Sequence, residues 1–181
     1  MKILIASDIH GSAKYCRELL SAYKRESAEK LLLLGDILYH GPRNGLCEEY
    51  DPKTVADLLN EMSADILCIR GNCDSEVDQM VLSFPMMSEF CLLDNCGVAA
   101  LAVHGHKDMD KLALGGVKIV FSGHTHVTTN ILRDGVIWAN PGSVTIPKEN
   151  TQQGYILWDK DVLEWKTLSG DVYDRRELSE I

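Results

Sequence analysis

Three short, continuous apolar runs constrain the fold of this chain more than any other feature of its sequence. They occupy residues 2–6, 30–34 and 66–69, with Gly, Asp or Asn close to their ends. Runs of this length without polar alternation are typical of strands that are covered on both faces. Apolar side chains at helical spacing follow in residues 13–27 and 52–63. The alternation predicts parallel strands connected by right-handed helical crossovers.

The second half of the chain is expected to consist mainly of strands. Turn residues separate predicted strands at residues 87–93, 98–103 and 117–121, a pair around Asp134-Gly135, and a last pair at 154–158 and 162–168. An α/β first half and a hairpin-rich second half predict two packed sheets with helices on the outside, a layered α/β sandwich. We expect a single domain over residues 1–181, in which the polar residues 169–181 form a loosely packed tail.

Composition excludes several classes of partner. The 181 residues are 45% hydrophobic, enough for a substantial core, and 18 basic against 27 acidic residues leave a net charge of −9. This charge repels nucleic-acid polymers and anionic membranes over most of the surface, so neither is expected as a partner. The apolar run at residues 2–6 is too short for a signal sequence or a membrane span, which predicts a cytoplasmic protein with reduced cysteines.

Potential metal ligands follow the predicted strands. Asp8 and His10 come directly after the first strand, Asp36 after the second and Asn72 after the third. The carboxyl ends of parallel strands lie along one edge of a sheet, so these four side chains should converge. The second half adds three histidines after two further strands: His104, His124 and His126.

The types of these residues indicate a metal site. Hard divalent cations prefer carboxylate and amide oxygens, whereas Mn, Fe, Zn and similar ions also accept imidazole nitrogen. A carboxylate such as Asp36 can bridge two ions about 3.5–4 Å apart, the spacing that clamps both oxygens of an in-line phosphoryl displacement. With Asp8 and Asp36 as the ionised ligands, two divalent ions leave a surplus of about +2, which attracts a phosphate ester to an acidic protein.

Each of these residues has a simpler interpretation when it is taken alone. An Asp after a strand usually caps a helix or forms a turn. A buried His is usually a structural residue, and alternate residues of a strand point the same way for packing reasons. What favours the metal site is the combination of seven candidates in five strand-end loops.

The candidate ligands also form a recognisable pattern. Asp8-x-His10, Gly35-Asp36, Gly71-Asn72, His104 and Gly123-His124-x-His126 follow one another in the order of the calcineurin-like metallophosphoesterase superfamily. The chain resembles this superfamily over residues 8–126. Longer stretches around the first three motifs resemble its bacterial YfcE-type phosphodiesterases, and Asn140-Pro141-Gly142-Ser143 followed by Pro147-Lys148 extends the resemblance to nearly the whole chain.

This resemblance implies a four-layer αββα sandwich of two packed mixed sheets with outer helices. It also implies a dinuclear site that hydrolyses phosphodiesters and is commonly activated by Mn²⁺, with Zn, Fe, Ni or Co as alternatives. One ion is then expected on Asp8, His10, Asp36 and His126. The other is expected on Asp36, Asn72, His104 and His124, so that Asp36 bridges the two.

Cys73 departs from the wider superfamily pattern. Many members carry a histidine at this position, directly after the Asn, where it is thought to assist the leaving group. A thiol is a poorer acid at neutral pH than imidazole, and a space-filling role for Cys73 stays open. Asp74 is expected to orient water or a neighbouring ligand. Arg43, His40 and His106 are candidates for contacts with substrate, although Arg43 could equally be a surface loop residue.

The expected activity is metal-dependent hydrolysis of small phosphodiesters. A hydroxide that bridges the two ions would attack phosphorus in line, and Cys73 or water would protonate the leaving oxygen. A phosphomonoesterase or protein phosphatase would use the same ions. A non-catalytic scaffold of the same fold is the alternative from another class, and loss of ligands would signal it. A homo-oligomer is plausible, but no interface can be read from the sequence.

Overall fold

The three apolar runs of the first half form adjacent parallel strands in the computed structural model, which describes residues 1–180. The strands are β1 (Lys2–Ala6), β2 (Lys30–Leu33) and β3 (Ile66–Cys68). Strand β2 pairs in parallel with both β1 and β3. Helices α1 (Ala13–Glu26) and α2 (Pro52–Asn60) connect them, so the predicted βαβαβ arrangement is confirmed.

Local sequence explains where the two connecting helices begin. Ser12 caps α1, because its side chain accepts a hydrogen bond from the Tyr15 backbone N–H. Asp51 caps α2 by accepting from the Thr54 N–H, and Pro52 occupies the first helical position, where no intrahelical N–H is needed.

A C-terminal set of antiparallel strands completes the first sheet. Strand β9 (Gly154–Asp159) pairs with β1, and β10 (Val162–Thr167) and β11 (Val172–Glu177) follow outward. The order across the sheet is β11-β10-β9-β1-β2-β3.

The prediction of a loosely packed tail at residues 169–181 is wrong for the residues that the structure describes. Strand β11 pairs antiparallel with β10, and a 3-10 turn at Leu178–Glu180 follows it, in which the Leu178 side chain is buried. The strand is polar because it lies at the edge of the sheet, where backbone hydrogen bonds rather than apolar contacts hold it. Residue 181 lies outside the described residues.

The second sheet is also mixed. It contains β4 (Phe90–Asn95), β5 (Val98–Val103), β6 (Ile119–Phe121), β7 (Thr128–Arg133) and β8 (Val136–Pro141). Their order is β4-β5-β6-β8-β7, with parallel pairs β5–β6 and β6–β8. The predicted sandwich of two packed mixed sheets is therefore confirmed.

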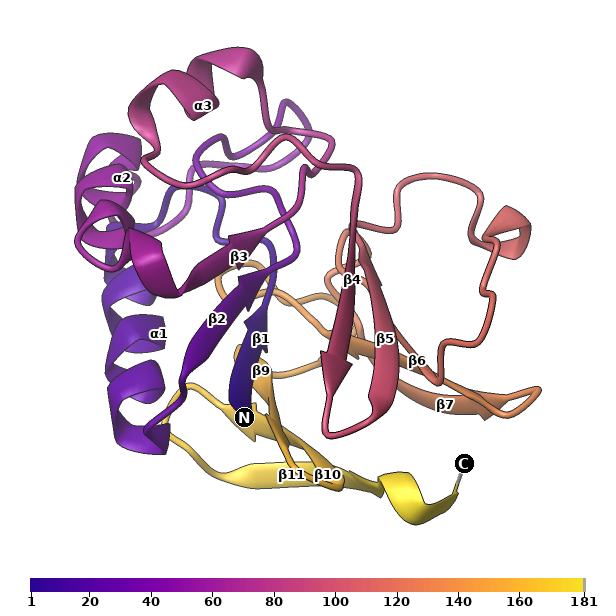
Figure 1. Ribbon diagram of the computed structural model, residues 1–181. Helices are drawn as coiled ribbons and strands as arrows, with labels where there is room; N and C mark the ends of the chain where they lie inside the picture. Colours follow the sequence, from indigo (N-terminus) through magenta and orange to yellow (C-terminus); the bar gives the residue numbers. More distant parts are fainter. Residues whose placement is uncertain (181) are drawn as a thin grey trace.

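The outer layers of the two sheets differ. Figure 1 shows α1 and α2 on the side of the first sheet that faces away from the second, with α3 (Glu76–Val81), which the sequence analysis did not identify, at the top. Residues 104–118 cover the outer face of the second sheet with one 3-10 turn at Met109–Lys111 instead of an α-helix. A further 3-10 turn lies at Ser63–Asp65. None of the described helices is long and apolar enough to cross a bilayer.

The main core lies between the two sheets. Alternate residues of β1 face different neighbours, because Ile3 and Ile5 pack between the sheets whereas Leu4 and Ala6 pack under the helices. Burial on both faces explains why the strand lacks polar alternation. The Trp165 side chain is fully buried in this core, and its indole N–H donates to the Asn140 carbonyl at 2.9 Å.

Replacement of Trp165 by Ala should therefore destabilise the protein strongly. The side chain is fully buried, so the change leaves a cavity and removes the hydrogen bond to Asn140, and we expect the free energy of unfolding to fall by about 3–5 kcal/mol in urea denaturation. Leu92→Ala is the control, because that side chain is 65% exposed and its loss should cost within about 0.5 kcal/mol. Equal effects of the two changes would contradict this account of the core.

Candidate metal centre

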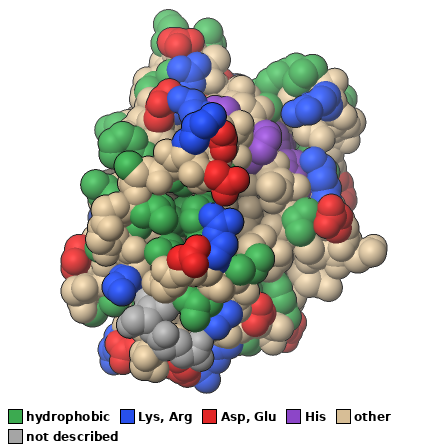
Figure 2. All heavy atoms as spheres, turned by 90° about the vertical axis from the view of Figure 1, so that its right-hand side faces the viewer, with side chains coloured by type: hydrophobic (Ala, Val, Ile, Leu, Met, Phe, Trp, Pro, Cys, Tyr) green, Lys and Arg blue, Asp and Glu red, His purple; other side chains and the backbone are tan. Residues whose placement is uncertain are grey.

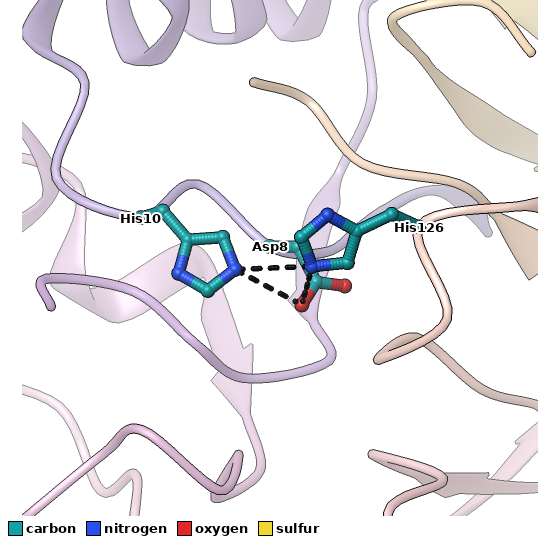
Figure 3. Close-up of side chains that lie close together, drawn as sticks. All are labelled: Asp8, His10 and His126. Atoms are coloured by element: carbon teal, nitrogen blue, oxygen red, sulfur yellow. Dashed lines mark hydrogen bonds and ion pairs between the residues drawn. The ribbon is translucent and has the colours of Figure 1, made fainter. Parts of the chain in front are cut away.

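The first group of candidate ligands comes from both sheets. Figure 3 shows the side chains of Asp8, His10 and His126 pointing toward one another. The His10 Nε2 and His126 Nε2 atoms lie 3.2 Å apart, and they lie 3.5 and 3.3 Å from Asp8 Oδ1. Asp8 and His10 follow β1 of the first sheet, whereas His126 follows β6 of the second. One cation placed among these atoms could contact all three side chains.

The second group surrounds Asp36. Its Oδ2 lies 3.4 Å from His104 Nε2, which in turn lies 3.1 Å from Asn72 Oδ1. The same Oδ2 lies 3.8 Å from His10 Nε2, so Asp36 reaches both groups. The His124 ring centroid is 5.2 Å from that of His104, and the His124 N–H donates to the Asp8 carboxylate. The structure thus brings all seven predicted ligands together.

Backbone carbonyls determine which ring nitrogen carries the hydrogen in three of the imidazoles. In each ring Nδ1 faces a carbonyl oxygen: His10 to Tyr39 at 2.8 Å, His104 to Leu34 at 2.6 Å and His126 to Ile146 at 2.7 Å. A carbonyl only accepts hydrogen bonds, so Nδ1 carries the hydrogen and donates. When such a ring is neutral, as a ligating imidazole is, its Nε2 atom carries a lone pair that points at the carboxylates.

This arrangement of lone pairs fits a metal ion. Asp8 Oδ1 is buried and accepts no hydrogen bond, although two imidazole nitrogens lie close to it. A buried acceptor without a donor is costly, and neutral lone pairs so close together repel one another. A cation bound between these nitrogen and oxygen atoms would pair with the carboxylate oxygen and remove the repulsion between the lone pairs. Mixed nitrogen and oxygen donors suit a transition metal.

The carboxylates and imidazoles shift one another's pKa values. Burial alone would raise the pKa of Asp8, but His10 and His126 outweigh it and hold the pKa well below its ordinary value. Burial likewise opposes ionisation of Asp36, whose pKa is nevertheless lowered by His104. Burial would lower the pKa of His104, but Asp36 and Asp8 raise it to about 9. Both carboxylates are therefore ionised at neutral pH and available to a cation.

Left-handed backbone conformations are concentrated at the candidate ligands. The angle φ is 59° at Asp8, 56° at Asp36 and 65° at His124, and it is also positive at His10 and His126. A non-glycine residue incurs a steric cost in this conformation, which persists only where the surrounding structure enforces it. The strand-end loops enforce the left-handed conformation at residues whose side chains turn toward the two groups of candidate ligands.

The buried Asp74 side chain connects two of these loops. Its buried carboxylate accepts hydrogen bonds from the backbone N–H groups of Asp36, Ile37 and Gly71 at 2.7–2.9 Å. Burial raises the pKa of Asp74, and these amide donors partly offset the rise. The geometry gives Asp74 a positioning role toward Asp36 and Asn72, with no contact to the open side of the site.

Cys73 lies between the second group and the solvent. Its N–H donates to Asp36 Oδ1 at 2.8 Å, and its Sγ lies close enough to His10 and Asp36 to share a cation with them. Burial and the neighbouring carboxylates raise the pKa of the Cys73 thiol to about 12. In the absence of a metal this thiol is therefore neutral and a weak acid.

The centre opens into a cleft of about 670 Å³ on one face of the molecule. Figure 2 shows one face of the molecule, on which histidine side chains reach the surface with Lys or Arg side chains beside them. The lining includes His10, Asp36, Asn72, His124 and His126, together with Arg43, Cys73 and Lys148. Arg43 thus lies where a substrate would. Lys148 entered the sequence analysis only within the Pro147-Lys148 resemblance and was given no role, because no ligand spacing singles out a loop lysine.

The other two candidates for substrate contact lie outside this lining. The His40 ring packs between Tyr39 and Tyr50, with centroids 4.7 and 5.1 Å away. His106 is exposed, with its ring 5.5 Å from His104, and it lines a separate apolar hollow of about 330 Å³ over the outer face of β5.

Comparison with known proteins identifies the family. A model of the calcineurin-like phosphoesterase superfamily domain matches residues 1–161. The chain belongs to this superfamily. It is 41% identical over 167 residues to phosphodiesterase YfcE of Escherichia coli K12, with 90% of each chain covered. The solved structure of YfcE, a phosphoesterase from E. coli, matches with a TM-score of 0.94 at 38% identity, over 98% of this chain and 100% of that one.

A more distant member of the fold is Vps29 of Entamoeba histolytica in complex with Zn²⁺. It matches with a TM-score of 0.68 at 20% identity, over 98% of this chain and 99% of that chain, and so shares the fold alone. Membership of the superfamily identifies the protein as a phosphoesterase and implies divalent metal ions as its cofactors.

The glycine before Asn72 is required by close packing against Asp36. A Cβ on Gly71 would lie 2.1 Å from Asp36 Oδ1 and 2.4 Å from the Asp36 backbone nitrogen. Gly71→Ala should therefore push the two loops apart and lower the free energy of unfolding by about 1–3 kcal/mol in urea denaturation.

Gly116→Ala is the matched control. Nothing lies within 4 Å of a Cβ at this position, and its φ is not positive, so this change should be neutral or slightly stabilising. If Gly71→Ala were as well tolerated as Gly116→Ala, the close contact between the two loops would be refuted.

Proposed function

We propose that the protein is a metal-dependent phosphodiesterase that hydrolyses small phosphodiesters at a site for two divalent ions. The observation that carries the proposal is the pair of adjacent ligand groups that share Asp36 at the base of an open cleft. Similarity to phosphodiesterase YfcE over 90% of the chain supports diesters as the substrates.

The proposed ligands divide between the two ions. Asp8, His10, Asp36 and His126 would hold the first, and Asp36, Asn72, His104 and His124 the second. We propose Mn²⁺ as the ion, with Zn, Fe, Ni and Co as alternatives, because carboxylate, amide and imidazole donors occur together.

Two bound divalent ions would supply a hydroxide nucleophile at neutral pH and stabilise charge on the phosphoryl oxygens. The residues of the chain do the rest. Asp74 holds the Asp36 and Asn72 loops in position, and the Arg43 guanidinium at the mouth of the cleft binds a nonbridging phosphate oxygen. Cys73, which lines the cleft beside Asp36, or a water molecule would donate the proton to the leaving oxygen.

Two alternatives remain distinct from this proposal. A phosphomonoesterase or protein phosphatase would use the same ions, and the ratio of kcat/KM for bis(4-nitrophenyl) phosphate to that for 4-nitrophenyl phosphate separates the two activities. The second alternative is a non-catalytic scaffold, which would not require a complete set of metal ligands. The convergence of all seven candidate ligands favours catalysis.

Asp36→Asn tests the bridging carboxylate. Loss of one negative charge between the ions should lower kcat/KM for bis(4-nitrophenyl) phosphate with Mn²⁺ by about 10²-fold or more and reduce the bound metal to at most one ion per chain. Elemental analysis gives the metal content. Asp134→Asn is the control, because that side chain is 93% exposed and should leave both quantities unchanged. Full activity of Asp36→Asn would exclude the proposal.

Metal binding should release protons. His104, with its pKa raised to about 9 by Asp36 and Asp8, is largely protonated in the metal-free protein at pH 7.5, but a ligating imidazole is neutral. Affinity should therefore rise with pH, by up to about tenfold per unit from this group, until the pH passes about 9. Calorimetric titration with Mn²⁺ in two buffers of different ionisation enthalpy measures the release. A binding enthalpy that is the same in both buffers would contradict it.

A further inference from the structure

Two cations at the mouth of the cleft have no ion-pair partner among residues 1–180. Most described Lys and Arg side chains form an ion pair with a carboxylate, as Lys14 does with Glu48. Arg43 and Lys148 form neither an ion pair nor a side-chain hydrogen bond with any residue that the structure describes, and both line the cleft. Lys24, Lys118 and Lys160 also form no ion pair with a described residue, but none of them lines the cleft, whereas Arg43 and Lys148 lie together there.

The backbone of Lys148 is fixed beside a proposed metal ligand. Its N–H donates to the His126 carbonyl at 3.0 Å, and its own carbonyl accepts from the N–H and hydroxyl of Thr151 at 3.0 and 2.8 Å. The neighbouring Ile146 carbonyl accepts from the His126 ring at 2.7 Å. The loop thus holds the Lys148 Cα in place, while the side chain is exposed at the rim of the cleft.

The charges of the cleft exceed what a simple diester needs. Two divalent ions with Asp8 and Asp36 leave about +2, which one hydroxide and one phosphodiester, each with a single negative charge, neutralise. Arg43, on the loop after β2, and Lys148, on the loop after β8, add two further positive charges. Both of these charges exceed what a singly charged diester balances. The diester phosphate would lie between the ions and Arg43, which leaves Lys148 available to a second anionic group of the substrate.

We propose that Lys148 binds an anionic group, a carboxylate or a phosphate, on the substituent of the phosphodiester that is not the leaving group. The natural substrate is then a diester with a second negative charge. This inference rests on the proposed phosphodiesterase function and specifies its substrate class. Lys148 acts through substrate affinity, because it contacts the substituent that is not the leaving group.

Four 4-nitrophenyl phosphodiesters with one leaving group test the inference. Their second substituents are ethyl (neutral), carboxymethyl and phosphonomethyl (anionic), and choline (cationic). With Mn²⁺ and the wild-type protein, we expect KM for one or both anionic esters to be about 5–10-fold below that for the ethyl ester, and KM for the choline ester to be highest. The anionic ester with the larger gain identifies the group that Lys148 binds.

Lys148→Met should bring the ratio of KM for the ethyl and anionic esters close to one, and Lys148→Glu should reverse the preference in favour of choline. Lys160→Met is the matched control. This lysine is exposed at the turn between β9 and β10. The turn lies near the amino end of β1, whereas the site lies at its carboxyl end, so the variant should keep the wild-type ratio.

The outcomes separate the two proposals. Hydrolysis of the ethyl ester without a preference for either anionic ester, or a preference that survives in Lys148→Met, overturns the role of Lys148 and leaves the phosphodiesterase intact. Failure of the wild-type protein to hydrolyse any of the four esters with Mn²⁺, Zn²⁺, Fe²⁺, Ni²⁺ or Co²⁺ overturns both.

Discussion

Crowding of electron pairs at one edge of the two sheets is the constraint on which much of the structure depends. Imidazole nitrogens of His10 and His126 lie 3.2 Å apart beside a buried carboxylate oxygen of Asp8 that accepts no hydrogen bond. This arrangement does not stabilise the folded chain by itself, because the neutral imidazole nitrogens repel the carboxylate oxygen and none of them donates a hydrogen bond to it. The left-handed ligands, the glycines without space for a side chain and the carbonyls behind the rings all serve to maintain it.

The first half of the fold was predictable because its strands are buried on both faces. Residues 2–6 had to be a covered strand, and the position of Asp8 and Asp36 at strand ends then followed from the topology of parallel sheets. Strand β11 and helix α3 were missed for the opposite reason. The residues of α3 are not buried and those of β11 lie at a sheet edge, so neither segment carries the apolar period that reveals an element.

The site divides in the same way. Residues that belong to strand-end motifs could be found from their order along the chain. The positions of nearby loop side chains could not, because they depend on loop conformations that no sequence pattern predicts. His40 follows the Asp36 loop closely in sequence, yet its ring packs between two tyrosines. Asp74 lies next to Cys73, but its carboxylate turns inward to backbone amides. Lys148 reaches the cleft from a loop that only the packed sheets bring there.

The division of the ligands between the two sheets has a consequence for cohesion. Asp8, His10, Asp36 and Asn72 extend from the first sheet, and His104, His124 and His126 from the second. Ions held jointly by both sets would act as a clasp that is absent from the unfolded chain, so occupancy and the resistance of the sandwich to opening are thermodynamically linked. A descendant that abandoned the chemistry and shed its histidines would lose that clasp, and would need new apolar contacts between the sheets to replace it.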